Sequence, residues 1–354
     1  MDFRKKAVGA ALAAMLTFGA VVPAFAHDGW TQSNTPIVAP NAVSYVELML
    51  GNHSNEHKSY RIAGQWSVDT SKVYVTMPAG VKADITSTRF YAGEAATETE
   101  PGVNNYFIAS FKSAVPGAYI ISAEGDSISR HGAAPSRTLR SAKSFVAIGD
   151  IPVMERVKAL EGFSKQVSPD RAELIPLFNP ASVTPGEDVA VQLLLKGEPL
   201  ANTNVDIIRR STSEAVELVT DEQGYVSFTT GLADYYLVRA KPSTTESKGD
   251  EYGSTNYEAT MTFTVQNESP KLPGHPSIAI PHIYLNGSLV EAEGTALNKG
   301  VTMVNADFIR QYVNKDFAGN GPVSLRSAIE QSGAVIEYFP AVGDLRAAVA
   351  IYTK

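Results

Sequence analysis

Short runs of β-forming residues constrain the fold of this chain more than any other feature of its sequence. The clearest runs are 43–50, 72–77, 106–111, 118–122, 189–195, 205–208, 225–228, 235–238 and 259–265. They are rich in β-branched, aromatic and aliphatic residues, and Gly, Pro and Asn stand between them, as is typical of strands joined by turns. The sequence therefore predicts a mainly β fold built from antiparallel sandwich modules.

The first 26 residues have the pattern of a secretion signal. Basic residues at 4–6 precede a small, apolar run at 7–22, and Ala24 and Ala26 stand at the −3 and −1 positions of a cleavage site. The apolar run is shorter than the ~20 residues that a membrane-spanning helix needs. We therefore expect an exported chain that begins at His27 and does not span the membrane. Its predicted location is secreted, periplasmic or at the cell surface.

Composition narrows the classes of function. The 354-residue chain has no cysteine, which excludes disulfides, thiolate metal sites and cysteine nucleophiles. Its formal charge is −7, and no basic cluster follows the signal, so no nucleic-acid partner is expected. It carries neither the G-x-S-x-G nor the H-E-x-x-H motif. The sequence therefore predicts a protein that is not an enzyme.

Changes of pattern along the chain define its predicted domains. These are a signal peptide at 1–26, a β-sandwich at 27–149, a connector at 150–172 with helical spacing at 153–163, a second β-sandwich at 173–267, a proline-rich linker at 268–277 and an α+β module at 278–354. The linker has three prolines in seven residues, which oppose both helices and central strands. We therefore expect the last module to fold independently.

The first two modules together resemble a known family. Gly197-Glu-Pro-Leu200, the turn that ends at Gly224, Phe228 and Tyr236-Leu-Val-Arg-Ala240 resemble secreted immunoglobulin-like and transthyretin-like modules. With 173–180 and the opening His27-Asp-Gly-Trp30, residues 27–267 resemble the periplasmic components of nickel and cobalt uptake systems and their uncharacterised secreted relatives. The resemblance implies two immunoglobulin-like sandwiches, a transition metal held by the N-terminal module, and a membrane transporter or cell-surface partner.

The last module has a resemblance of its own. Ile283-Tyr-Leu-Asn-Gly287, Thr302-Met-Val304 and the stretch 323–335 are similar to the small domain named after the copper amine oxidase N-terminus. That resemblance covers 278–354 and implies a stalk-like α+β domain without catalytic apparatus, suited to surface or partner contacts.

The histidines decide how far metal chemistry can be predicted. After cleavage, His27 carries both a free α-amine and an imidazole, which together chelate Ni, Co, Cu or Zn. The α-amine has a pKa of ~7.7–8, so this ligand is available near neutral pH. Further candidate ligands are His53, His57, His131 and Asp28. The alternative is that these side chains are ordinary surface groups.

Two principal functions follow from these observations. The first is a non-catalytic envelope protein that binds or delivers a transition metal through its N-terminal module. The alternative is a structural or adhesive envelope protein without a metal site. A copper oxygenase is a third hypothesis, resting on His27 alone. Convergence of three imidazole or amine nitrogens would favour the metal-binding hypothesis, and dispersed histidines would favour the structural one.

Overall fold

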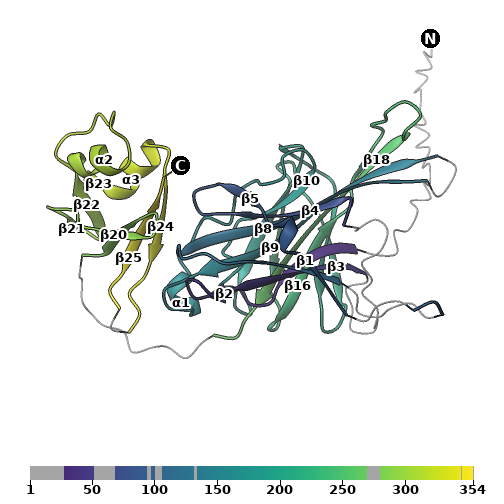
Figure 1. Cartoon of the computed structure of the whole chain (residues 1–354), viewed down its shortest axis with the longest axis horizontal. Coiled ribbons are helices and arrows are strands. Elements are labelled where there is room, and N and C mark those ends of the chain that lie inside the picture. The colour runs from purple at the N-terminus through teal and green to yellow at the C-terminus, as the bar shows by residue number, and fades with distance from the viewer. Residues whose placement is uncertain are drawn as a thin grey trace, which may run out of the picture.

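The computed structural model describes residues 28–51, 68–93, 97–99, 106–130, 134–268, 280–343 and 345–353. Strands dominate these ranges and the helices in them are short, which confirms the predicted mainly β class. Figure 1 shows a body, residues 28–268, beside a smaller C-terminal module, residues 280–353. The predicted signal peptide lies outside the described residues.

A ten-stranded middle sheet runs through the body. Its main path has the order β14-β13-β16-β18-β9-β8-β4-β5, with β17 beside β18 and β2 beside β9. The strands are β14 (Ala215–Val219), β13 (Asn204–Arg209), β16 (Asp234–Ala240), β18 (Ser254–Val265), β9 (Ser136–Ile148), β8 (Gly117–Ser129), β4 (Ser71–Thr76), β5 (Lys82–Asp84), β17 (Ser243–Thr244) and β2 (Ile37–Val38).

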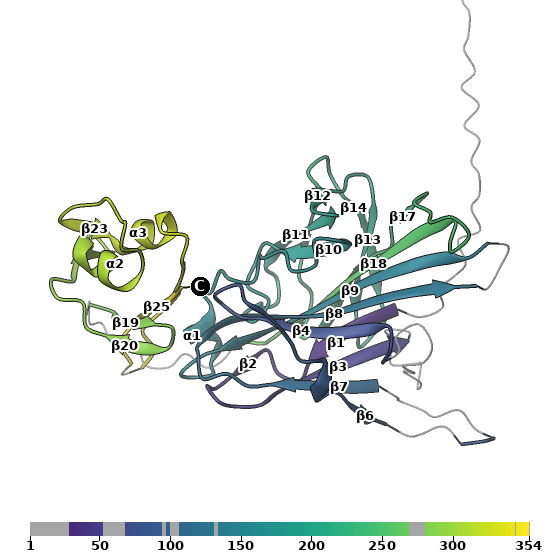
Figure 2. The ribbon, with the colours of Figure 1, turned by 45° about the horizontal axis from the view of Figure 1, so that its top comes forward.

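Two four-stranded outer sheets complete the body. The first has the order β1-β3-β7-β6 and consists of β1 (Asp28–Ser33), β3 (Ser44–Gly51), β7 (Tyr106–Phe111) and β6 (Phe90–Ala92). The second consists of β10 (Ala172–Pro176), β11 (Asp188–Leu195), β12 (Glu198–Pro199) and β15 (Tyr225–Thr229). In Figure 2 the first outer sheet and the β10–β12 region lie on opposite sides of β4, β8 and β9.

The side chains of β9 alternate between two hydrophobic cores. Phe145 and Ala147 belong to the core under the second outer sheet, whereas Val146 and Ile148 belong to the core under the first. Because successive side chains of a strand point to opposite faces, one strand can serve both cores. The body is therefore a three-layer β structure, and β9 of the middle sheet is buried on both faces.

The middle sheet crosses the predicted boundary between the sandwich modules. β9 comes from the predicted module 27–149 and β18 from the module 173–267, yet they pair in parallel, with Ser136 opposite Ser254 and Lys143 opposite Met261. Two sandwiches are present, as predicted, but they share this sheet. The predicted modules therefore form one continuous unit.

Short helical segments join these layers. They are η2 (Thr86–Thr88) and α1 (Met154–Val157). The helical spacing predicted at 153–163 yields only the single turn of α1, because Leu160 and Phe163 leave the helix to enter the core under the second outer sheet.

The C-terminal module has two small sheets and two helices. They are β19 (His282–Leu285), β20 (Ser288–Val290), β24 (Val335–Phe339) and β25 (Ala348–Tyr352) in one sheet, β21 (Ala296–Asn298), β22 (Val301–Asn305) and β23 (Pro322–Ser324) in the other, and helices α2 (Ala306–Tyr312) and α3 (Leu325–Gln331). Asn305 and Ser324 cap the helices by accepting backbone hydrogen bonds. Ile283, Phe308, Leu325 and Ile351 contribute to a separate core.

One sheet face of this module packs against the body. The docked face consists of Val335, Glu337 and Phe339 of β24 and Ala348, Ala350 and Tyr352 of β25. Most of its apolar residues belong to the same buried cluster as Ala118, Val157 and Phe163 of the body. The predicted linker lies largely outside the described residues, but the module beyond it has both a core of its own and a buried contact with the body.

Candidate functional site at the start of the first strand

β1 lies across the middle sheet and is held there by polar side chains of β18. Thr260 and Thr262 donate hydrogen bonds to the carbonyl oxygens of Gly29 and Thr31, over 2.7 and 2.6 Å. The Gly29 amide donates to Glu258 Oε1 over 2.6 Å. These bonds satisfy buried backbone groups of an edge strand and hold β1 against β18.

Asp28, the first residue of β1, is bound by two cations. Its side chain is 6% exposed, and its two oxygens lie 2.5 Å from Arg239 Nη1 and 2.5 Å from Lys241 Nζ. Arg239 also contacts Asp206, with Nε 2.7 Å from Oδ2. Burial would lower the pKa of Arg239, but Asp28 and Asp206 outweigh it and the pKa is raised. The cluster is therefore a closed set of opposite charges.

A second ion pair lies under Gly29. Arg140 Nε and Glu258 Oε2 are 3.3 Å apart, with side chains only 1% and 3% exposed. A Cβ at position 29 would lie 3.2 Å from both Arg140 Cδ and Glu258 Oε1. Gly29 therefore allows the strand to approach this buried pair closely.

A third pair joins β9 to the second outer sheet. Lys143 Nζ lies 2.5 Å from Glu173 Oε1, and the two side chains are 1% and 0% exposed. Glu173 also accepts hydrogen bonds from the amides of Val167 and Ser168, and Lys143 donates to the Leu174 carbonyl. Burial lowers the pKa of Lys143, although Glu173 acts in the opposite direction. The charged groups of Lys143 and Glu173 therefore find their ion-pair and hydrogen-bond partners inside the fold.

The structure pairs Asp28, one of the candidate ligands, with two cations. His27, His53, His57 and His131 lie outside the described residues. Asp28 is buried, so it is not the ordinary surface carboxylate that we considered as an alternative. His282 is described and packs beside Tyr284 in β19. Within the described ranges, no three His, Asp or Glu side chains are grouped as metal ligands would be.

One feature of the site does concern the predicted ligands. β1 and β3 are antiparallel, and Asp28 lies opposite Gly51. In the sequence, His27 directly precedes Asp28, and His53 is the second residue after Gly51. The two described residues nearest to them in the sequence, Asp28 and Gly51, are therefore paired at neighbouring strand ends.

Sequence reasoning missed the partners of Asp28 and Gly29. Arg239 lies in the run 236–240 that resembles an immunoglobulin-like pattern, and no motif singles out Arg140 or Glu258. The sequence gives one indication of these residues: each is a charged residue within an otherwise strand-like run. That signal indicates burial of a pair but does not identify the partners.

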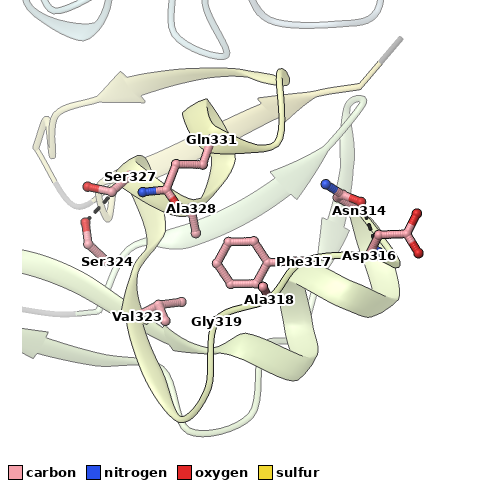
Figure 3. A pocket seen from close by; sticks show the side chains of 10 residues that line it. All are labelled: Asn314, Asp316, Phe317, Ala318, Gly319, Val323, Ser324, Ser327, Ala328 and Gln331. Atoms are coloured by element: carbon pink, nitrogen blue, oxygen red, sulfur yellow. Dashed lines mark hydrogen bonds between the residues drawn. The ribbon is translucent and has the colours of Figure 1, made fainter.

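Two pockets of the C-terminal module are lined by none of the charged residues that are paired around β1. The pocket in Figure 3, about 500 Å³, lies between α3 and the segment after α2. Its polar side chains serve local turns: Asn314 accepts from the Asp316 amide, and Ser324 accepts from the Ser327 amide. A larger groove of about 580 Å³ in the same module is lined by residues such as Leu297, Ile336 and Val349.

Comparisons with known proteins give a family but no activity. Residues 24–244 match the family model described as a domain of unknown function, DUF4198. No curated protein matches the chain. None of the helices in the described ranges is long and apolar enough to cross a membrane.

Solved structures give distant likenesses. A segment of two fibronectin type III domains from chicken tenascin is 12% identical, covering 68% of this chain and 99% of that one, with a TM-score of 0.18. The Yersinia pseudotuberculosis adhesin InvE is 12% identical, with coverage of 91% and 92% and a TM-score of 0.17. The Bacillus cereus major pilin subunit BcpA is 9% identical, with coverage of 69% and 70% and a TM-score of 0.18.

Proposed function

Since the chain belongs to the family of DUF4198, a domain of unknown function, we propose its function from its geometry: it is an exported, non-catalytic structural protein of the cell envelope. The observation that carries this proposal is the closed pairing of buried charges around β1 and β9. Asp28, Glu258 and Glu173 each contact a cation of another strand. These carboxylates join layers of the fold.

Catalysis by side chains needs acid or base groups that can reach a substrate. The paired carboxylates are buried and already neutralised, so they are unsuited to that role. The three-layer packing of residues 28–268 instead suits a rigid body that presents its outer surfaces to partners in the envelope.

Fractionation tests the structural proposal. The full chain is expressed in a bacterial host, and cytosol, envelope and medium are separated. We expect the protein outside the cytosol, with an N-terminus at His27. We also expect its urea unfolding midpoint to be the same with and without Ni²⁺ or Cu²⁺. Recovery from the cytosol with residues 1–26 retained would contradict the proposal, and a midpoint raised by metal would favour the second candidate below.

The second candidate is transition-metal binding at the strand ends of β1 and β3. The register that pairs Asp28 with Gly51 favours it, because His27 directly precedes Asp28 in the sequence and His53 is the second residue after Gly51. An α-amine and imidazole from His27, joined by His53 or His57, would supply the nitrogen donors that Cu²⁺ and Ni²⁺ prefer. A membrane transporter or cell-surface partner would then receive the metal.

Calorimetric titration of Cu²⁺ and Ni²⁺ tests this candidate. The processed chain is compared with His27→Ala and with a chain carrying one extra alanine before His27. Both changes should weaken binding by ~10-fold or more, equal to about 1.4 kcal/mol. Binding should fail below about pH 6, where protons compete for the nitrogens. His282→Ala is the control. Equal affinity with and without the extra alanine would exclude the amine chelate.

A further inference from the structure

A buried carboxylate lies in the contact between the C-terminal module and the body. Glu337 is on the docked face, opposite Ala350 in the strand register and between Val335 and Phe339 along β24. It is only 2% exposed. Neither carboxylate oxygen makes a hydrogen bond of normal geometry. This carboxylate therefore lacks the closed pairing seen around β1.

The Glu337 side chain packs against the body at Gly162 and Ala118. A Cβ at Gly162 would lie 2.2 Å from Glu337 Oε1 and 3.1 Å from Ala118 Cβ, so the Glu337 carboxylate packs directly against the backbone at position 162. Gly162 follows α1, and Ala118 is the second residue of β8. Both belong to the body, and β24 has a neighbouring strand only on its β25 side. Undocking would therefore return Glu337 to water.

Hydrogen bonds also cross the interface between the C-terminal module and the body. Arg156 of α1 is held by Asp150 and donates to the carbonyl oxygens of Phe339 and Arg346 over 3.4 and 3.1 Å. Tyr352 donates to the Pro116 carbonyl. These bonds hold the docked face in place while Glu337 stays buried.

We propose that the C-terminal module is a pH-responsive latch: protonation of Glu337 stabilises its docking on the body, and ionisation of Glu337 weakens it. The latch responds to pH because the neutral carboxyl is favoured in the buried contact, whereas the ionised carboxylate is favoured in water.

The charged and titratable groups that face Glu337 come from three elements. Lys165, in the segment after α1, favours the charged carboxylate, and Glu161 of the same segment opposes it. Tyr119 of β8 and Tyr352 of β25 also interact with it. Burial of these tyrosines raises their pKa values, to about 12 for Tyr119, so they stay neutral at physiological pH.

Burial dominates the balance at Glu337. It raises the pKa from an ordinary 4.5 to about 7, against Lys165 and the nearby amides of Gly162 and Ala118. Because docking raises the pKa of an acid, docking is strongest below pH 4.5 and weakens as the pH rises towards 7 and above. These two values correspond to a fall of about 70-fold in the docking constant between pH 5 and pH 8.

Fluorescence energy transfer in the full chain can measure docking. The chain has no cysteine, so Lys158→Cys and Ser327→Cys accept a dye pair selectively. Both positions are exposed, and they start close together because neighbouring Glu161 and Arg326 are 3.1 Å apart. Urea titrations at pH 5, 6, 7 and 8 follow undocking. Tryptophan fluorescence follows the body, since both tryptophans lie before residue 70.

Three variants decide the outcome. In the labelled parent chain the urea midpoint for undocking should fall from pH 5 to pH 8, with the docking constant weakening about 70-fold. Glu337→Gln and Glu337→Ala should remove this pH dependence, whereas Glu293→Gln, an exposed carboxylate of the same module, should keep it. If undocking coincides with unfolding, the same comparison applies to the single midpoint. A parent midpoint independent of pH, or full pH dependence in Glu337→Gln, would overturn the proposal.

Discussion

Removing one member of the Lys143–Glu173 pair should destabilise the body strongly. The variant Glu173→Gln leaves the Lys143 ammonium buried without a counter-charge, 2.5 Å from where the carboxylate stood. It also weakens the acceptor for two backbone amides. Breaking a fully buried ion pair on one side costs about 3–5 kcal/mol. We expect a loss of that size for Glu173→Gln, and a similar one for Lys143→Met.

The double variant separates pairing from packing. Replacing both partners, as Lys143→Met with Glu173→Leu, leaves no uncompensated charge. The free energy of unfolding lost in this double variant should therefore be smaller than the sum of the losses in the two single variants. Free energies of unfolding come from urea titrations followed by tryptophan fluorescence and by circular dichroism. A loss below about 1 kcal/mol for Glu173→Gln, or a double variant that costs the full sum, would refute the reasoning from burial.

The same variant should respond to pH in a defined direction. Burial lowers the pKa of Lys143, and Glu173 counteracts this. Without Glu173 the pKa should fall further. A base whose pKa is lowered by folding gains stability as the pH rises towards its unfolded value of about 10.4. The deficit of Glu173→Gln relative to the parent should therefore shrink between pH 7 and pH 9.

Three further predictions concern stability and are checked by denaturant titration. Gly29→Ala should cost about 1–3 kcal/mol, because its Cβ would crowd Arg140 and Glu258 at 3.2 Å; an unchanged midpoint would contradict this. Arg156→Ala should lower the urea midpoint for release of the C-terminal module, because it removes interface hydrogen bonds worth about 2–3 kcal/mol of docking free energy. Leu325→Ala should cost about 2–5 kcal/mol within that module, since Leu325 is fully buried in its core.

The predictable part of the fold was the part with strong local signals. The run 106–111 became β7 and the run 225–228 became most of β15. Turn chemistry was also readable: Asn286 and Gly287 have the positive φ angles of 48° and 89° that a tight hairpin turn needs. The last module contains α2 and α3 beside its strands, in agreement with the α+β class predicted for it.

β9 was not predicted as a strand because its sequence lacks the usual alternation of apolar and polar residues. Both of its faces are buried, so apolar and polar residues do not alternate as they do in a half-exposed strand. It also contains Arg140 and Lys143, whose charges suggest an exposed segment. Their partners Glu258 and Glu173 lie far away in the sequence, and no local spacing connects them.

The candidate site was predictable to a smaller extent. The sequence drew attention to the start of β1 through His27 and Asp28, and the structure places a charged cluster there. It gave no reason to expect Arg239 and Lys241 as the partners of Asp28, because such contacts depend on strand order. The burial of Glu337 could not be predicted either. The sequence of β24 does not show whether the face that carries Glu337 is exposed to solvent or packed against the body.

The parallel pairing of β9 with β18 has a consequence for biogenesis. The middle sheet stays divided until Ser254–Val265 emerges, because β18 is the strand that joins its two halves. Contacts so distant in sequence make folding slow. A chain released before this strand, including one ending at residue 244 where the family match ends, would leave β9 and β16 as open edges. Open edges recruit strands from other molecules, so folding of the middle sheet has a late step that is open to aggregation.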